Sequence, residues 1–165
     1  MEIIKHQPIG IIHSPHNKPQ GMPIQPASAK GIKGKIEIFP EFAVGLKDIE
    51  GFSHLILIFH FHLSEGYNLE VTPFLDNIKH GVFATRAPRR PNQIGLSVVK
   101  LNSKYDNILH IENVDIINGT PLLDIKPYAP VFDEAHNIKL GWLANSPGKW
   151  STTFNDGRFN NNTGT

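Results

Sequence analysis

Two histidines near the end of a long apolar run have the type and spacing for metal or proton chemistry. His60 and His62 close the run FSHLILIFHFH, which spans residues 52–62. Side chains of a strand alternate between its two faces, so both imidazoles share one face, while positions 55, 57, 59 and 61 make an apolar face. Such a His-x-His pair is a possible metal half-site and a possible proton acceptor. Histidines with a purely structural role are the alternative.

A second cluster holds three arginines in the segment TRAPRRPNQIG, residues 85–95. Pro88 and Pro91 fix their own φ angles and restrict the residues before them, so Arg86, Arg89 and Arg90 are displayed on a stiff loop. The planar guanidinium suits carboxylates and phosphates, and a rigid display lowers the entropic cost of recognition. We therefore expect an anion-binding loop, with a solvated basic loop of no function as the alternative.

A third candidate is the turn within NVDIINGTPLLDIKPY, residues 113–128. Asn118 and Gly119 are typical of a tight turn between two apolar runs, and such a turn leaves backbone amides and carbonyls free to contact a ligand. Asp115 and Asp124 flank it. A purely structural hairpin turn is the alternative.

The composition and the absence of certain motifs exclude several kinds of functional site. The 165 residues include no cysteine, which excludes disulfides, thiolate metal sites and a cysteine nucleophile. The sequence has no glycine-rich dinucleotide or P-loop motif, no HExxH and no GxSxG, so a nucleotide-like cofactor would bind by an uncommon route. The formal net charge is only +1, so any affinity for RNA must come from a local patch.

The chain start, MEIIKHQPIG, lacks the features of a signal peptide. No apolar run approaches the roughly 20 residues that cross a bilayer. We therefore expect a cytoplasmic protein that has no membrane partner.

Thirteen prolines and fourteen glycines divide the chain into short extended runs. This pattern indicates a mainly β protein with little helix. Seven runs suit a small closed or nearly closed β-barrel with long loops, since closure removes exposed sheet edges. The predicted strands are residues 3–13, 34–39, 52–62, 81–85, 95–101, 108–117 and 122–127.

The length and a hydrophobic content of 39% support one barrel domain, residues 1–145, followed by a polar C-terminal tail, residues 146–165, that we expect to be frayed. Residues 16–30 contain three prolines and are predicted to form a long loop of the kind that often serves function. Residues 41–46 are predicted to form one or two helical turns after Pro40.

Four segments together resemble one family: PIGIIHSP at 8–15, GLKDIEGFSHLILIFHFH at 45–62, GVFATRAPRRPNQIGLSVVKL at 81–101 and DIINGTPLLDIKPY at 115–128. The chain is similar to the TsaA-like or TrmO family of tRNA methyltransferases. The resemblance implies S-adenosylmethionine as cofactor, held on a small β-barrel, and a homodimer with sites near its interface. It also implies transfer of a methyl to N6 of threonylcarbamoyladenosine, next to the anticodon of tRNA.

The resemblance further implies roles for single residues. The accepting nitrogen is conjugated with both the purine and a carbamoyl carbonyl, so a general base would help. Candidates by residue type are His60, Asp124 and Tyr128, with His62 also considered. Arg86 is expected in the pocket, whereas Arg89 and Arg90 are expected to meet RNA; no metal is expected. The cofactor positions carried over by matching motifs are Gln25, Pro26, Ala27, His62, Leu63, Arg86, Leu96, Asp115, Ile116, Ile117, Asn118, Gly119 and Thr120.

Two departures from the family pattern bear on these expectations. Asn118 stands where the family usually has aspartate, which matters only if a carboxylate there is essential. The resemblance runs to about Asp133 and about thirty residues follow it, whereas bacterial relatives often carry a longer extension thought to hold tRNA. Two other functions stay open: a metal-dependent hydrolase built on His60, His62 and Asp124, and an RNA-binding module without turnover.

Overall fold

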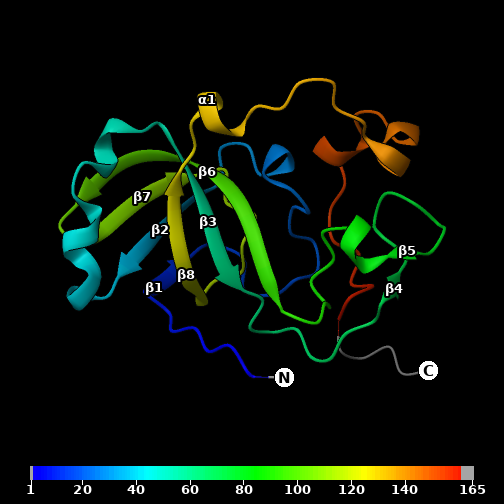
Figure 1. Ribbon diagram of the computed structural model, residues 1–165, viewed down its shortest axis with the longest axis horizontal. Helices are drawn as coiled ribbons and strands as arrows, with labels where there is room; N and C mark the ends of the chain where they lie inside the picture. The colour runs from blue at the N-terminus through cyan, green and yellow to red at the C-terminus, as the bar shows by residue number, and fades with distance from the viewer. Residues whose placement is uncertain (1, 161–165) are drawn as a thin grey trace.

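The computed structural model describes residues 2–160. Among these residues, six strands form a closed antiparallel barrel in the order β1-β2-β7-β6-β3-β8, on the left of Figure 1. The predicted mainly β barrel with little helix is therefore confirmed. The barrel strands are β1 (Gly10–His13), β2 (Lys33–Ile38), β3 (His54–His60), β6 (Ile94–Tyr105), β7 (Ile108–Glu112) and β8 (Thr120–Pro127).

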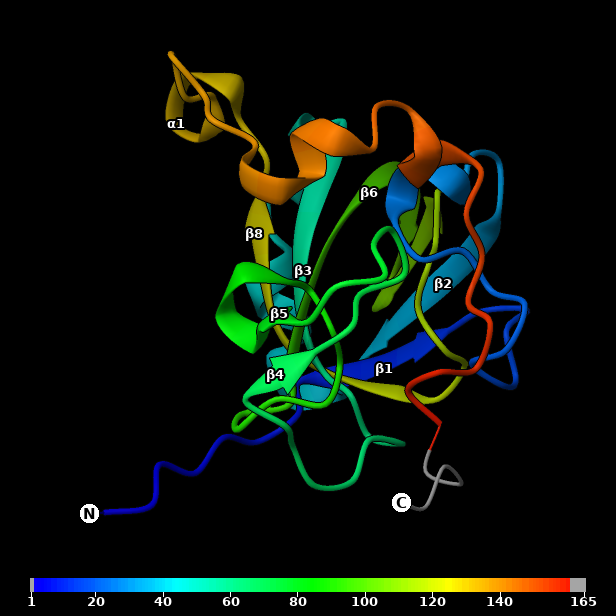
Figure 2. The ribbon, with the colours of Figure 1, turned by 90° about the vertical axis from the view of Figure 1, so that its right-hand side faces the viewer.

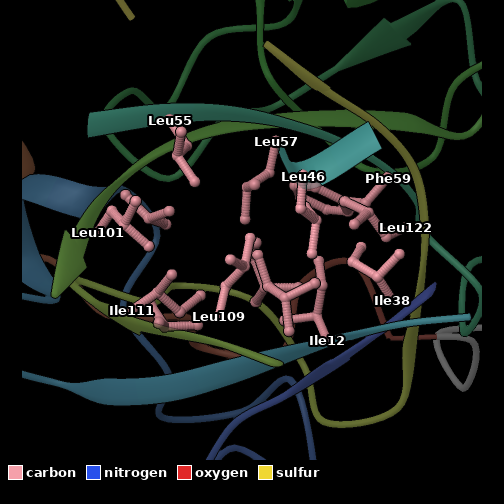
Figure 3. Packing of buried hydrophobic residues seen from close by; sticks show 14 residues of the cluster. Ile12, Ile38, Leu46, Leu55, Leu57, Phe59, Leu101, Leu109, Ile111 and Leu122 are labelled. Atoms are coloured by element: carbon pink, nitrogen blue, oxygen red, sulfur yellow. The ribbon is translucent and has the colours of Figure 1, made fainter. Parts of the chain in front are cut away.

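The alternation predicted along residues 52–62 builds the barrel core. Leu55 and Leu57 are fully buried and Phe59 nearly so, while the residues between them are half-buried on the outer surface. Figure 3 shows these side chains pointing into the barrel together with Leu46. Leu46 ends the 3-10 helix η2 (Pro40–Leu46), which confirms the helical turns predicted after Pro40. Each buried side chain of this size contributes roughly 1.5–3 kcal/mol to folding.

Three predicted strands differ from the structure by more than two residues at one end. Residues 3–9 are not a strand, because β1 begins at Gly10 and residues 2–8 are exposed without a neighbouring strand. The strand predicted at 108–117 ends at Glu112, since Asn113 takes a left-handed φ of 70° that breaks the ladder. The strand predicted at 95–101 instead runs on to Tyr105.

The strand predicted at residues 81–85 was wrong. Only β5 (His80–Gly81) is extended, paired with β4 (Glu70–Val71) in a separate two-stranded sheet. Val82–Ala84 form the 3-10 helix η4. The amide and the hydroxyl of Thr85 both donate to the carbonyl of Val82, and these local bonds close a turn in place of a ladder.

Residues 146–160 are not the frayed tail expected from their polar composition. They run back along the long loop before β2: Pro23 and Phe154 form an isolated bridge, and Asn155 exchanges two backbone hydrogen bonds with Gly21 and Met22. Phe159 packs against the small buried cluster beside the barrel. The end of the predicted tail, residues 161–165, lies outside the described residues. Figure 2 shows residues 146–160, drawn from orange to red, beside the blue loop.

The irregular half of the molecule, to the right in Figure 1, contains β4, β5 and the C-terminal segment. Within residues 2–160, no helix is long and apolar enough to cross a membrane. The remaining short helices are η1 (Pro26–Ser28), η3 (Ile49–Gly51), α1 (Pro130–Asp133), η5 (Gly141–Asn145) and η6 (Lys149–Ser151).

Candidate functional site

A cavity of about 380 Å³ lies where the barrel meets the irregular half. Its wall combines the end of β3, the outer face of β6, the turn before β8, the long loop before β2 and the C-terminal segment. This volume lies within the range of small-molecule sites. The described residues that line it are Pro19, Met22, Pro23, Ile24, Gln25, Phe59, Phe61, His62, Leu63, Ser64, Phe74, Arg86, Pro88, Leu96, Asp115, Ile116, Ile117, Thr120, Asn155, Phe159 and Asn160.

The end of β3 turns its aromatic side chains toward the cavity. The pairing register of β3 with β8 shifts between Ile58 and Phe59, and the amide of His62 then donates to the carbonyl of His60 at 2.8 Å. Phe59 and Phe61 follow the alternation onto one side of the chain, and the tight turn after His60 brings His62 to the cavity beside them, although strict alternation would place it on the opposite face. The rings of Phe59 and Phe61 meet edge to face at 5.3 Å.

Gly95 of β6 lies opposite Phe59 in the sheet. A Cβ atom at this position would overlap the Phe59 ring, so only glycine lets the ring lie across the strand. The RPNQIG motif thus supplies the backbone surface on which a cavity side chain rests.

Asp115 carries the only carboxylate among the described residues that line the cavity. Its Oδ1 accepts a hydrogen bond from the hydroxyl of buried Ser97 at 2.6 Å. Burial raises the pKa of Asp115 to about 6, while Ser97, its own backbone amide and Arg86 act in the opposite direction. The group is therefore mostly ionised at neutral pH despite its surroundings.

His62 is held in one tautomer by its neighbours. The hydroxyl of Thr120 donates to the carbonyl of Ile117 at 2.7 Å, so its oxygen accepts from Nδ1 of His62 at 3.3 Å. With the proton on Nδ1, the Nε2 atom has a free lone pair. Burial, and secondly the charge of His60, lower the pKa of His62, which keeps the ring neutral at pH 7.

Arg86 places its guanidinium at the boundary of two cavities. Nη1 donates to Oε1 of Gln25 at 3.2 Å. Both residues line the cavity just described and also an adjacent one of about 600 Å³. Pro26 and Ala27, expected beside Gln25 at the cofactor, line the adjacent cavity instead. Gln25 thus lies at the boundary that the two spaces share.

The Asn118-Gly119 turn supports the site without lining it. The carboxamide oxygen of Asn118 accepts from the amide of Ser14 at 3.2 Å, and its nitrogen donates to Oδ1 of Asn17 at 3.4 Å. Gly119 has a φ of 79°, which favours glycine. The side chain at position 118 therefore anchors a loop, and a carboxylate there would keep the bond from Ser14.

Three residues expected to take part in catalysis lie apart from the cavity lining. His60 pairs with Ile94 in the sheet and acts on the site through the charge it places near His62. Asp124 is on the barrel wall, bound to Lys126 at 2.8 Å. Tyr128 lies at the other end of β3, its ring 6.4 Å from that of His54.

The arginines of the expected RNA loop have different surroundings. Nη1 of Arg90 donates to the carbonyls of Thr85 and Ala87 at 3.0 and 3.2 Å, so this guanidinium braces its own loop. Nε of Arg89 donates to the carbonyl of Glu65 at 3.1 Å in an exposed bond. Among the described residues, the guanidinium of Arg89 is thus held by one exposed hydrogen bond, whereas that of Arg90 is held by two bonds within its own loop.

Several cavity residues were missed in the sequence. Phe74, Asn155, Phe159 and Asn160 come from segments that carry no motif, and the C-terminal three lie in the stretch predicted to be frayed. One signal was present: the two phenylalanines of the tail, Phe154 and Phe159, are unusual in a segment that only needs to be solvated.

Comparison with known proteins gives the family of this chain. Residues 11–134 match the tRNA-methyltransferase O N-terminal domain. The chain belongs to the TrmO family. TrmO from Pseudomonas aeruginosa has a solved structure that superposes with a TM-score of 0.72 at 36% identity. The superposition covers 86% of this chain and 63% of that one, so this chain spans less than two thirds of the solved TrmO.

The names of TrmO relatives point to cofactor and substrate. A probable S-adenosyl-L-methionine-binding protein of Pyrococcus abyssi is 56% identical over 95% of this chain and 85% of its own length. The tRNA (adenine(37)-N6)-methyltransferase of Escherichia coli is 33% identical over 89% of this chain and 67% of its own length. A similarly named binding protein of Archaeoglobus fulgidus is covered over only 39% of its length.

Proposed function

We propose that this TrmO-family protein transfers a methyl group from S-adenosylmethionine to N6 of adenine 37 in tRNA. We further propose that the substrate base carries a threonylcarbamoyl group, as the resemblance implies. The observation that carries the proposal is the convergence of Gln25, His62, Arg86, Leu96 and Asp115, from separate segments, on one cavity in a chain of this family.

The cavity residues fit the chemistry of S-adenosylmethionine. The molecule carries an ammonium, a sulfonium, a carboxylate and an adenosine group. Ionised Asp115 complements the positive groups, and the guanidinium of Arg86 complements the carboxylate. Phe59, Phe61 and Leu96 offer apolar surface to the adenosine. We assign the backbone of the turn after Asp115 to contacts with the same molecule.

When bound, S-adenosylmethionine supplies an electrophilic methyl on a positively charged sulfur. The protein must then align the accepting nitrogen, exclude water and receive the N6 proton. His62 suits the last task, because Nδ1 donates to Thr120 while Nε2 keeps a free lone pair. Its lowered pKa keeps it unprotonated at pH 7. We assign His62 as the proton acceptor in place of His60, Asp124 and Tyr128, which lie away from the cavity.

We also propose a homodimer that acts on tRNA in the cytoplasm. Ile94 and Leu96 of β6, beside the cavity, are 41% and 52% exposed. A second copy covering this apolar edge would shield the site from water. Arg89, in its exposed bond beside the cavity, is assigned to tRNA phosphates. Light scattering of the purified protein tests the dimer: a monomer at working concentration contradicts it.

The decisive experiment offers the protein labelled S-adenosylmethionine with two matched tRNAs, one carrying and one lacking the threonylcarbamoyl group. Label should enter the modified tRNA and, after digestion, appear on N6 of adenine 37. Equal labelling of both tRNAs refutes the substrate assignment alone. No labelling of the correctly modified tRNA supports the RNA-binding module without turnover, whereas retained S-adenosylmethionine binding counts against that alternative.

The metal-dependent hydrolase has no support in the side-chain geometry. Among the described residues, no group of three histidine, aspartate or glutamate side chains is arranged to hold a metal ion. Asp124 in particular is bound to Lys126 and is not a cavity residue beside His62.

A further inference from the structure

The adjacent cavity of about 600 Å³ has no part in the assignment above except through its shared boundary. It shares Ile24, Gln25, Phe74, Arg86 and Phe159 with the first cavity, so the two spaces lie side by side. Its other wall comes from η4 and η5. The residues that line only this cavity are Pro26, Ala27, Pro73, Leu75, Phe83, Ala84, Thr85, Ala87, Leu140, Trp142 and Leu143.

Trp142 is held rigidly in the wall of this second cavity. Its indole Nε1 donates to the carbonyl of Ala84 at 2.8 Å. The imidazole of His80 stacks on the indole at 4.7 Å with an interplanar angle of 17°. His80 is bound in turn to Asp76 at 3.0 Å and does not line the cavity, so it backs the indole from outside. A ring fixed in this way loses little entropy when a ligand stacks on it.

We propose that this second cavity receives the adenine base that is to be methylated, with Trp142 and Phe83 as its aromatic contacts. The inference rests on the proposed function, since it names the place of the substrate in that same site. A methyl acceptor must lie against the methyl donor, and the second cavity meets the first at Gln25 and Arg86.

The chemistry of the wall favours a nucleobase over the other ligands of this reaction. Bases of single-stranded RNA loops are recognised by stacking on aromatic rings, and Trp142 and Phe83 provide such surfaces. Among the described lining residues, the single charged group is Arg86, at the inner boundary. The rest of the described wall is uncharged, which suits a neutral base.

Phe83 also indicates an open route to this space. Its side chain is 76% exposed, although it is aromatic and lines a cavity. A base extruded from an RNA loop can therefore reach the cavity from the surface. Phe83 can also be replaced with little effect on folding, which makes it a clean position for a test.

The test uses an anticodon stem-loop RNA carrying threonylcarbamoyladenosine at position 37, and the same RNA abasic at that position. Trp142→Ala and Phe83→Ala should each weaken binding of the first RNA roughly 5- to 150-fold, the range for loss of one stacking contact. S-adenosylmethionine affinity, measured by calorimetry, should change less than twofold. Trp142→Phe, which keeps a ring but loses the bond to Ala84, should retain most of the RNA affinity.

Phe132→Ala is the matched control, because Phe132 is 80% exposed and lines neither cavity.

A second experiment follows the fluorescence of Trp142 in a Trp150→Phe background. This fluorescence should be quenched by the stem-loop with adenine and not by the abasic one. Equal quenching or equal affinity for both RNAs overturns the proposal, as does loss of S-adenosylmethionine affinity in Trp142→Ala. If quenching depends on the base but no methyl is transferred, the second cavity is still supported as the binding site of the base, while the proposed function is refuted.

Discussion

The hydroxyl of Ser97 donates to Oδ1 of Asp115 at 2.6 Å, and this bond joins β6 to the segment after β7 at the floor of the cavity. Ser97 is buried and Asp115 has a pKa raised to about 6 by burial. The bond therefore fixes an anion in a place that disfavours charge. Proteins retain such costly groups mainly at sites of function.

Asp115→Asn should stabilise the protein at neutral pH. Asn keeps an oxygen for the bond from Ser97 but carries no charge. Because the folded-state pKa of about 6 lies above the ordinary value of 3.8, stability from this group is fully present below pH 3.8 and is lost as pH rises through 6. The variant's advantage in unfolding free energy should thus grow over this window, to at most about 3 kcal/mol at pH 7.

Urea unfolding at several pH values measures this advantage. Asp124→Asn is the matched control, since that carboxylate is 45% exposed and bound to Lys126. An Asp115→Asn variant whose advantage is the same at pH 4 and pH 7 would contradict the raised pKa.

His62→Gln should lower kcat about 10²- to 10⁴-fold, the usual contribution of a general base. The pKa of His62 is below 6.5, so the wild-type kcat should hold at pH 7 and fall in more acid solution as the ring takes up a proton. His60→Gln removes a charge that lowers this pKa and should move the acid limb to higher pH with little loss of maximal rate. A pH–rate profile of each variant checks both, and an unchanged acid limb in His62→Gln refutes the assignment.

The barrel was predictable because its signal is local. The alternation at residues 55–61 places Leu55 and Leu57 inside wherever the strand pairs, and it was confirmed. The cavity depends on contacts distant in sequence. Pro23 and Phe154, which are far apart in the sequence, form an isolated β-bridge, and no local sequence pattern predicts such a contact. His62 reaches the cavity through the tight turn after His60, which strict alternation does not contain.

Arg86→Ala should weaken S-adenosylmethionine binding roughly tenfold or more, which corresponds to loss of a hydrogen bond to a charged group. Its guanidinium lines the cavity and is steadied by Gln25. Arg89→Ala is the matched control, because Arg89 does not line the cavity. Calorimetry measures the S-adenosylmethionine affinity of both variants. Equal affinities would show that Arg86 does not contact the cofactor.

Replacing Arg89 should mainly affect RNA binding, whereas replacing Arg90 should mainly affect the stability of the protein. Arg89→Ala should reduce the slope of log K against log salt by about 1, as expected when one phosphate contact is lost. Arg90→Ala should instead lower the melting temperature, since its guanidinium binds two carbonyls of its own loop. Filter binding of tRNA at several salt concentrations and thermal unfolding test the pair. A flattened salt dependence in Arg90→Ala with normal stability would contradict the bracing role.

Gly95→Ala should damage both the barrel and the cavity. The added methyl would overlap the ring of Phe59, which is 5% exposed and lines the cavity. Overpacking of this kind costs about 1–3 kcal/mol, and a displaced ring would also weaken S-adenosylmethionine binding. Gly45→Ala is the matched control, because a Cβ there meets open space. Urea unfolding and calorimetry should show losses for Gly95→Ala only; equal behaviour of the two variants would mean that Phe59 can move aside without consequence for the site.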